Sequence, residues 1–324
     1  MGPERRTLPT LLCLVLALVG ACSAPPDGPS EGAVAEAGGA PATHAHPEAA
    51  AFAAETEDWD VAEAKVRWAT DPERQQLGFG ELLAALGETF VGTAYEPQTL
   101  ELPGSERLVI NLRSLDCVTF VENVLALARL ARTLEPEELA DSATLRRAFR
   151  AELEGLRYRG GRLNGYASRL HYFSEWLSDN EARGTVDGVS AELGGVLDPE
   201  PVDFMSSHPD AYRQLADAAV LAQVAQIEAR LGRLERYYIP EDEIEGKAHL
   251  IRTGDIIAAT STVEGLDVAH TGIAVWKDGA LKLLHAPLVG SSVQLSERSL
   301  AERIKSIGGQ DGIMVARPVD PRES

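Results

Sequence analysis

Hydrophobic residues recur at helical spacing through the first two thirds of the chain. In the clearest case Val118, Val121 and Val124 fall three residues apart and continue into an apolar run that ends near Ala128. Pro136 is suited to the first position of another helix, where a backbone N–H has no partner to lose. By these criteria we predict helices near residues 59–68, 79–90, 118–128, 136–158, 168–178 and 211–236.

The C-terminal quarter changes to short apolar runs that are typical of strands. Asp278-Gly279 separates two of these runs and is a strong signal for a two-residue hairpin turn. Residues 108–112 predict a further short strand or an extended lead-in to the helix that follows. The C-terminal strands are expected near residues 255–260, 271–276, 281–285, 292–295 and 313–318. Helices followed by a small antiparallel sheet indicate the α+β class.

The N-terminus has the pattern of an export signal. Arg5 and Arg6 precede an apolar run over residues 8–19 that is too short to span a bilayer comfortably. Val19-Gly20-Ala21-Cys22 resembles the bacterial lipobox, in which the cysteine carries lipid and becomes the mature N-terminus. The alternative is an ordinary secreted protein cut near Ala24.

These signals divide the chain into three parts. We expect a signal peptide over residues 1–21, a flexible Ala/Pro/Gly-rich tether over 22–55 and one catalytic domain over 56–324. Lipidation at Cys22 predicts a lipoprotein of the cell envelope that faces the periplasm, with the outer membrane weakly preferred. The formal net charge of −20 argues against a nucleic-acid partner. We expect a monomer that needs no cofactor.

The three cysteines have different expected fates. Cys13 leaves with the signal and Cys22 carries lipid, so Cys117 remains as the one thiol of the exported domain. Cys117 lies at the start of the helix near residues 118–128, where the helix dipole lowers a thiol pKa from about 8.5 toward neutrality. This position suits a nucleophile. The alternative is a small core cysteine that only packs.

The hairpin around Asp278-Gly279 brings two histidines together. If Lys277 faces Ala280, then His270 and His285 are diagonal neighbours on one face, about 7–8 Å apart at Cα. A slip of one residue would place them on opposite faces. We therefore predict Cys–His catalysis, in which His270 accepts the Cys117 proton and His285 orients His270.

Two other interpretations of the same three residues remain. Cys117, His270 and His285 could bind a catalytic zinc ion, although the sequence lacks a short-spaced ligand pair such as H-E-x-x-H. The two histidines could also be unrelated surface residues. We predict no metal.

A polar, glycine-rich loop over residues 158–166 leads into a stretch rich in aromatic residues. Tyr166, Arg169 and His171 lie there, beside Tyr172 and further aromatic rings. Such a mixture suits a wall that contacts a sugar or a peptide. The alternative is that the rings pack in the core while the arginines lie in solvent.

Three motifs in this order resemble a known family: residues 115–122 around Cys117, residues 165–173, and residues 270–274 with 284–286. They are similar to the DUF1460 branch, the N-acetylmuramoyl-L-alanine amidase-like branch of the NlpC/P60 cysteine peptidases. The similarity extends from about Gly78 to Pro318.

The resemblance implies a papain-like α+β fold with a helical half packed on the sheet and with helical insertions. It implies Cys117 as nucleophile, His270 as base and His285 as the orienting residue. Tyr95 matches an upstream G-x-x-Y pattern and, with Tyr166, Arg169 and His171, is a candidate for binding substrate.

The implied activity is a peptidoglycan amidase that cuts muropeptides between the lactyl group of N-acetylmuramic acid and L-alanine. One alternative is an endopeptidase of the same class that cuts between γ-D-glutamate and the diamino acid. The others are a non-catalytic lipoprotein that binds cell wall and a transglutaminase or acyltransferase.

Overall fold

The computed structural model describes residues 47–323, with side chains from Glu55 onward. The expected signal peptide, Cys22 and the tether as far as residue 46 lie outside the described residues. Residues 47–55, expected as the end of the tether, instead begin helix α2 (Pro47–Ala69). Alanine is frequent in this stretch and is the strongest helix former, which explains the earlier start.

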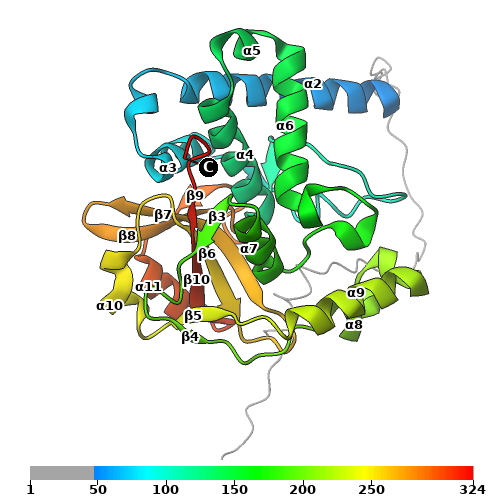
Figure 1. The fold of residues 1–324 in the computed structure, drawn as a ribbon, viewed down its shortest axis with the longest axis vertical. Coiled ribbons are helices and arrows are strands. Elements are labelled where there is room, and N and C mark those ends of the chain that lie inside the picture. Colours follow the sequence, from blue (N-terminus) through cyan, green and yellow to red (C-terminus); the bar gives the residue numbers. More distant parts are fainter. Residues whose placement is uncertain (1–46, 324) are drawn as a thin grey trace, which may run out of the picture.

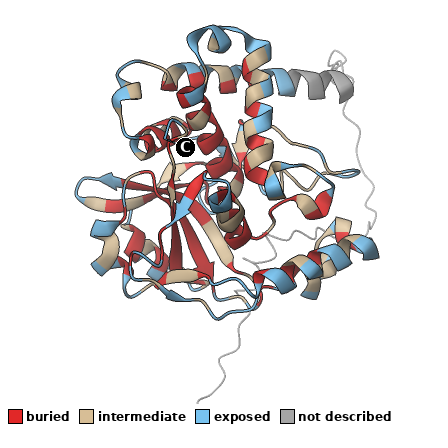
Figure 2. Ribbon diagram, in the orientation of Figure 1, coloured by how far each residue is buried: buried red, intermediate tan, exposed pale blue. Residues whose placement is uncertain are grey.

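Helix α4 (Cys117–Thr133) lies at the centre of the helical half. It packs against α2, α3 (Phe79–Glu88), α6 (Ser142–Arg157) and strand β7 (Val268–Lys277). Figure 1 shows these helices grouped above one end of the sheet, and Figure 2 shows α4 buried along nearly its whole length. A helix buried on most faces is the structural counterpart of its nearly continuous apolar sequence.

The main sheet of the described residues has eight strands, in the order β4-β5-β10-β6-β7-β8-β9, with β3 paired to β10. All its pairs are antiparallel. The strands are β3 (Val186–Gly188), β4 (Val196–Leu197), β5 (Tyr237–Pro240), β6 (Ile256–Ser261), β7, β8 (Ala280–His285), β9 (Gln294–Leu295) and β10 (Gln310–Pro318). A short parallel pair, β1 (Ala94–Tyr95) and β2 (Ser114–Leu115), precedes α4. The α+β prediction is confirmed.

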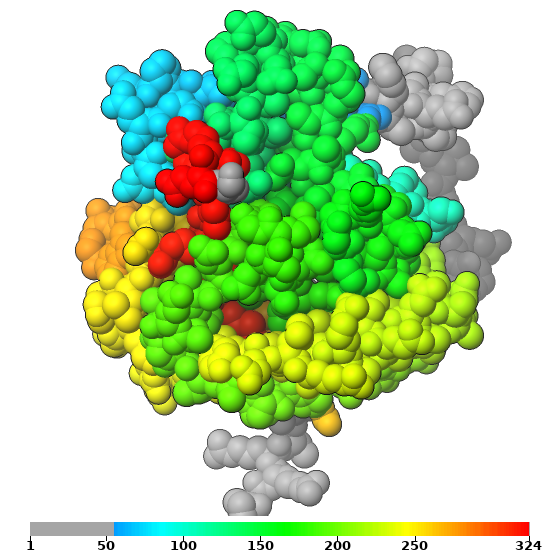
Figure 3. Space-filling view, viewed as in Figure 1, coloured from blue at the N-terminus to red at the C-terminus, as the bar shows by residue number. Residues whose placement is uncertain are grey.

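The two faces of the sheet contact different cores. Ile256 and Ala258 of β6 pack against the helical half, whereas Ile257 and Ala259 pack in a second cluster with α11 (Leu300–Lys305). This alternation follows from the two-residue period of a strand. The chain end also joins the layers: Figure 3 shows the last residues, in red, on the surface of the helical half. Asp320 there forms an ion pair with Arg132 of α4.

The predicted hairpin register is confirmed. Lys277 is paired with Ala280 and Ile273 with Leu284, which brings Gly272 opposite His285. A Cβ atom added at Gly272 would lie 2.7 Å from the Leu284 oxygen, so the close approach of the two strands requires glycine there. A register shift between Ala259 and Thr260 of β6 falls beside His270 and marks a bulge of the kind that often re-aims side chains near active sites.

Several predicted boundaries are wrong because local capping overrides hydrophobic periodicity. The helix expected over 136–158 is two helices, α5 (Pro136–Ala140) and α6, since Asp141 accepts the N–H groups of Ala143 and Thr144. The helix expected over 168–178 is α7 (Phe173–Ala182).

The helix expected over 211–236 is shorter. It is α9 (Ala218–Leu231), capped by Asp217. The short helices α8 (Phe204–Ser207) and α10 (Ile244–Lys247) lie on either side of it in the chain. Strands β3, β4 and β5 were not expected. No helix in the described part of the chain is long and apolar enough to cross a membrane.

Gly254 provides a test of how α3 docks on the sheet. Its φ is +93°, and a Cβ atom there would lie 2.1 Å from the backbone oxygen of Gly80 in α3. We expect Gly254→Ala to destabilise the fold by about 2 kcal/mol or more, or roughly 4–8 °C in Tm. Gly246→Ala is the control, because its Cβ would meet nothing within 4 Å. Equal melting temperatures for both variants would contradict this packing.

Candidate active site

Cys117 is the first residue of α4, and the preceding residue holds the turn in place. The Asp116 carboxylate accepts the Thr119 N–H at 2.7 Å, while the Thr119 hydroxyl accepts the Asp116 N–H at 2.9 Å. This reciprocal arrangement is a capping box. The Cys117 side chain is buried.

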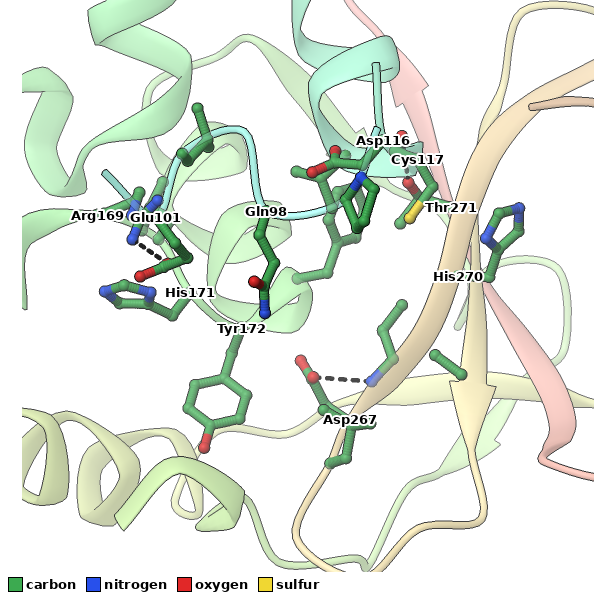
Figure 4. Close-up of a pocket in the computed structure, with 18 of the residues that line it drawn as sticks. Gln98, Glu101, Asp116, Cys117, Arg169, His171, Tyr172, Asp267, His270 and Thr271 are labelled. Carbon is green, nitrogen blue, oxygen red and sulfur yellow. Dashed lines mark hydrogen bonds and ion pairs between the residues drawn. The ribbon is translucent and has the colours of Figure 1, made fainter. Parts of the chain in front are cut away.

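Thr271 joins this helix end to the sheet. Its hydroxyl donates to the Cys117 carbonyl oxygen at 2.8 Å. Thr271 follows His270 in β7, so the bond places Cys117 next to the predicted base. Figure 4 shows Cys117, Thr271 and His270 together at one end of a pocket, with Arg169 and His171 at the other.

The two predicted histidines form a hydrogen-bonded pair. His270 Nε2 lies 2.7 Å from His285 Nδ1, and the rings are nearly perpendicular at 87°. Arg303 Nη2 also donates to His285 Nδ1, at 3.4 Å. Because a guanidinium can only donate, this His285 nitrogen is an acceptor. The hydrogen between the rings therefore belongs to His270 Nε2.

This assignment leaves His270 Nδ1 with a free lone pair. Figure 4 shows one ring nitrogen of His270 on the side toward Cys117 and the other facing away. Since Nε2 is bonded to His285, Nδ1 is the nitrogen on the cysteine side. The arrangement can therefore accept a proton from the thiol.

The expected lowering of the Cys117 pKa is wrong. Burial, with the nearby charge of Asp116, raises the pKa of Cys117 to about 11, although hydrogen bonds from Thr271 oppose the shift. Burial also lowers the pKa of His270 well below 6.5, helped by His285 and by the positive charge of Arg303. The resting pair is thus a neutral thiol beside a neutral imidazole. Sequence position alone showed the helix dipole but not the burial that outweighs it.

Two cavities meet at Cys117 and His270. The smaller, of about 220 Å³, extends toward Arg169, His171 and Asp267. The larger, of about 650 Å³, extends toward His285 and Arg303. A substrate with a large group on each side of its scissile bond could occupy both.

The four candidate substrate-binding residues have different surroundings. Tyr95 lines both cavities beside Cys117. Arg169 and His171 line the smaller cavity, but Arg169 is buried in ion pairs with Glu101 and Glu106. Tyr166 lines neither cavity; its ring packs 4.4 Å from that of His171.

The carboxylates around the smaller cavity are already engaged. Glu122 pairs with Arg157 at 2.7 Å and Glu101 pairs with Arg169. Asp267 accepts the N–H groups of Ser174 and Val268, both at 2.7 Å. The bond to Ser174 caps helix α7, which explains why that helix begins at Phe173.

The geometry does not favour the metal alternative. No group of three or more His, Cys, Asp or Glu side chains within residues 55–323 is arranged to hold a metal ion. His285 Nδ1 is also occupied by His270 and Arg303.

Thr271 and Arg303 are site residues that sequence reasoning missed. Thr271 directly follows His270, the predicted base, and this adjacency could have identified Thr271 as a site residue. Arg303 lies in α11, which was not expected, although Ser299 and Glu302 form a capping-box pattern that predicts a helix start. No pattern in the sequence placed that helix beside His285.

A family model described as N-acetylmuramoyl-L-alanine amidase-like matches residues 85–311, which include Cys117, His270, His285 and Arg303. The chain belongs to this family. The predicted resemblance is confirmed at this level, and placement of the family within NlpC/P60 stays a prediction.

Two solved structures are also similar to the chain. An N-acetylmuramoyl-L-alanine amidase from Bacteroides uniformis is 35% identical, with a TM-score of 0.68 over 74% of this chain and 98% of that one. A Bacteroides fragilis protein provisionally described as a xylanase is 36% identical, with a TM-score of 0.66 over 71% and 98%. Comparison with curated proteins finds no match.

A more distant structure shares the fold. Protein LPG0564 from Legionella pneumophila, described by the family model DUF1460, is 19% identical. Its TM-score is 0.59 over 83% of this chain and 96% of that one.

Alkylation of Cys117 tests the neutral resting pair of this amidase-like protein. Because the thiolate is the reactive form, the rate of carbamidomethylation by iodoacetamide should rise continuously above pH 7, toward a midpoint of about 11. Mass spectrometry of the Cys117 peptide provides the measurement. A plateau beginning near neutral pH would show a preformed thiolate–imidazolium pair instead.

Proposed function

We propose that the protein is a cysteine-dependent peptidoglycan amidase that hydrolyses the amide between the N-acetylmuramic acid lactyl group and L-alanine. The observation that carries this proposal is the buried Cys117 beside the hydrogen-bonded pair of His270 and His285, at the junction of two cavities. Membership of the amidase-like family supports the choice of substrate.

The first half of the reaction forms a thioester. Cys117 Sγ attacks the lactyl carbonyl carbon while its proton moves to His270 Nδ1. The resulting imidazolium donates through Nε2 to the His285 acceptor, which stabilises its charge. His270 then gives the proton from Nδ1 to the departing L-alanine nitrogen, and the C–N bond breaks.

Two donors can stabilise the oxyanion. The Cys117 N–H is among the first N–H groups of α4, which have no partner within the helix. Tyr95 lines the cavity next to Cys117, and its hydroxyl makes no hydrogen bond within the described residues. Burial raises the pKa of Tyr95, so its phenol keeps its proton and can donate.

The second half consumes water. His270 Nδ1 accepts a proton from water as the oxygen attacks the thioester, and the thiol leaves with that proton. The products are a free lactyl carboxylate on the sugar and an intact stem peptide. The carboxylates around the cavity neither exchange a proton nor bind a ligand in either half of the reaction. They are engaged in ion pairs and helix caps.

The finer predictions from the sequence belong to this proposal. A papain-like NlpC/P60 fold fits a cysteine at a helix N-terminus packed against a histidine-bearing antiparallel sheet. The lipid anchor at Cys22 and the periplasmic location fit a peptidoglycan substrate. An endopeptidase that cuts after γ-D-glutamate would use the same three residues, so product analysis separates the two activities.

Substitution of the nucleophile tests the mechanism. Cys117→Ala should lower hydrolysis of a muramoyl peptide by about 10⁴-fold or more, because covalent catalysis is lost. Mass spectrometry should find free sugar and an intact stem peptide with the wild-type protein alone. An unchanged melting temperature would show that the fold survives. Full activity of the variant, or activity lost to EDTA but not to iodoacetamide, would rule out the proposed mechanism.

Substitution of His285 tests the orienting role. His285→Ala removes the acceptor for His270 Nε2, so the active tautomer is no longer fixed and kcat/KM should fall between about 10-fold and 1,000-fold. His285→Gln keeps an acceptor and should retain more activity than the alanine variant. If kcat/KM for His285→Ala equals that of the wild type, His285 is not part of the site.

A further inference from the structure

Arg303 differs from the other arginines that lie below the surface. Every other buried or half-buried arginine among residues 55–323 forms an ion pair with a carboxylate. Arg303 is half-buried and has no carboxylate partner among those residues. Acidic side chains are abundant in a chain with a net charge of −20. The lack of a carboxylate partner for Arg303 is therefore a feature of this site.

The hydrogen bonds of Arg303 leave most of its donors free. Its Nη1 donates to Gln310 Oε1 and its Nη2 to His285 Nδ1, both at 3.4 Å and both to neutral acceptors. A guanidinium has five N–H donors. Burial lowers the pKa of Arg303 only to about 10, so the group is charged at neutral pH.

The free side of this cation faces the larger cavity. Arg303 lines that cavity together with Cys117 and His270. Glu297 is the acidic residue among those that line it, and it is exposed and forms no ion pair with Arg303. A charged guanidinium with free donors, open to a cavity beside the nucleophile, is suited to a carboxylate on the substrate.

We propose that Arg303 binds the free α-carboxylate of D-glutamate in the stem peptide, and that the larger cavity holds the peptide side of the substrate. This inference rests on the proposed function. It assigns the side of Cys117 on which the peptide part of the substrate lies. The positions of Cys117, His270 and His285 alone do not determine that side.

The position of Arg303 matches that carboxylate. The Arg303 guanidinium and His270 Nε2 both donate to His285 Nδ1. The His270 nitrogen that faces Cys117 lies on the other side of the His270 ring from this shared acceptor. In the stem peptide the D-glutamate Cα follows the L-alanine Cα, so its carboxylate lies one Cα spacing plus about one bond at each end, or roughly 6–7 Å when extended, beyond the scissile nitrogen. D-Glutamate is linked through its γ-carboxyl, which leaves the α-carboxyl free.

The test compares two muramoyl tripeptides, both amidated at the C-terminus. They differ only at the D-glutamate α-carboxyl, which is free in one (the acid) and amidated in the other (the amide). The wild type should have a kcat/KM at least about tenfold higher for the free acid, as a charge-assisted hydrogen bond implies. Arg303→Gln should reduce this ratio to within about twofold. Arg303→Lys should retain part of it, because charge remains without the planar fork.

The ratio separates binding of the carboxylate from support of His285. Loss of the Arg303–His285 bond slows both substrates alike, so a purely positioning role leaves the ratio unchanged. Lys305→Gln is the matched control: it removes one positive charge from the same helix, where Lys305 pairs with Asp242. This control should keep the wild-type ratio. A wild type without preference, or a preference that survives in Arg303→Gln, overturns the proposal.

Failure of the proposed function gives a different result. In that case the wild type releases no intact stem peptide from either substrate, whether or not it cuts another bond, and calorimetric binding of the free tripeptide amides to Cys117→Ala decides. Tighter binding of the acid than of the amide, abolished by Arg303→Gln in that background, would support the anion site. Equal binding of both peptides would overturn it.

Discussion

The hydrogen bond from the Thr271 hydroxyl to the Cys117 carbonyl connects the two halves of the molecule at the site. It joins residues 154 positions apart in the chain. A bond of this kind contributes only about 1 kcal/mol, so it does not by itself hold the layers together. The apolar core between α4 and β7 does that, and the hydrogen bond determines the position of the helix end relative to the hairpin. The proposed nucleophile and the proposed base come from separate layers, so their relative position depends on this contact.

Buried charge provides a second constraint beneath the site. Glu122, five residues along α4 from Cys117, pairs with Arg157 of α6, and both side chains are almost fully buried. Burial raises the pKa of Glu122 while Arg157 opposes the shift. Arg157 also donates to the Val109 oxygen at 2.6 Å. The pair thereby fixes the extended segment that leads into the α4 turn, and loss of either partner would leave a buried charge unpaired.

Features that depend on neighbouring residues could be predicted from the sequence. The α4 start, helix α3 and the register of the β7–β8 hairpin follow from spacing and from the Asp278-Gly279 turn, and these place His270 beside His285. Features that depend on distant packing could not. The raised pKa of Cys117 comes from burial, and β5 pairs with strands far away in the chain. Arg303 reaches His285 only because α11 folds back beside β8.

The meeting of two cavities at one cysteine also has a kinetic consequence. In the proposed reaction and substrate direction, the sugar stays covalently attached to Cys117 after the amide breaks, while the peptide is free to diffuse away through the larger cavity. The vacated space then gives solvent a path to the thioester, on the side where His270 and His285 lie. Release of the first product and entry of the second reactant thus use the same opening. Such an enzyme follows ping-pong order, and accumulated stem peptide slows it by returning to the acylated form.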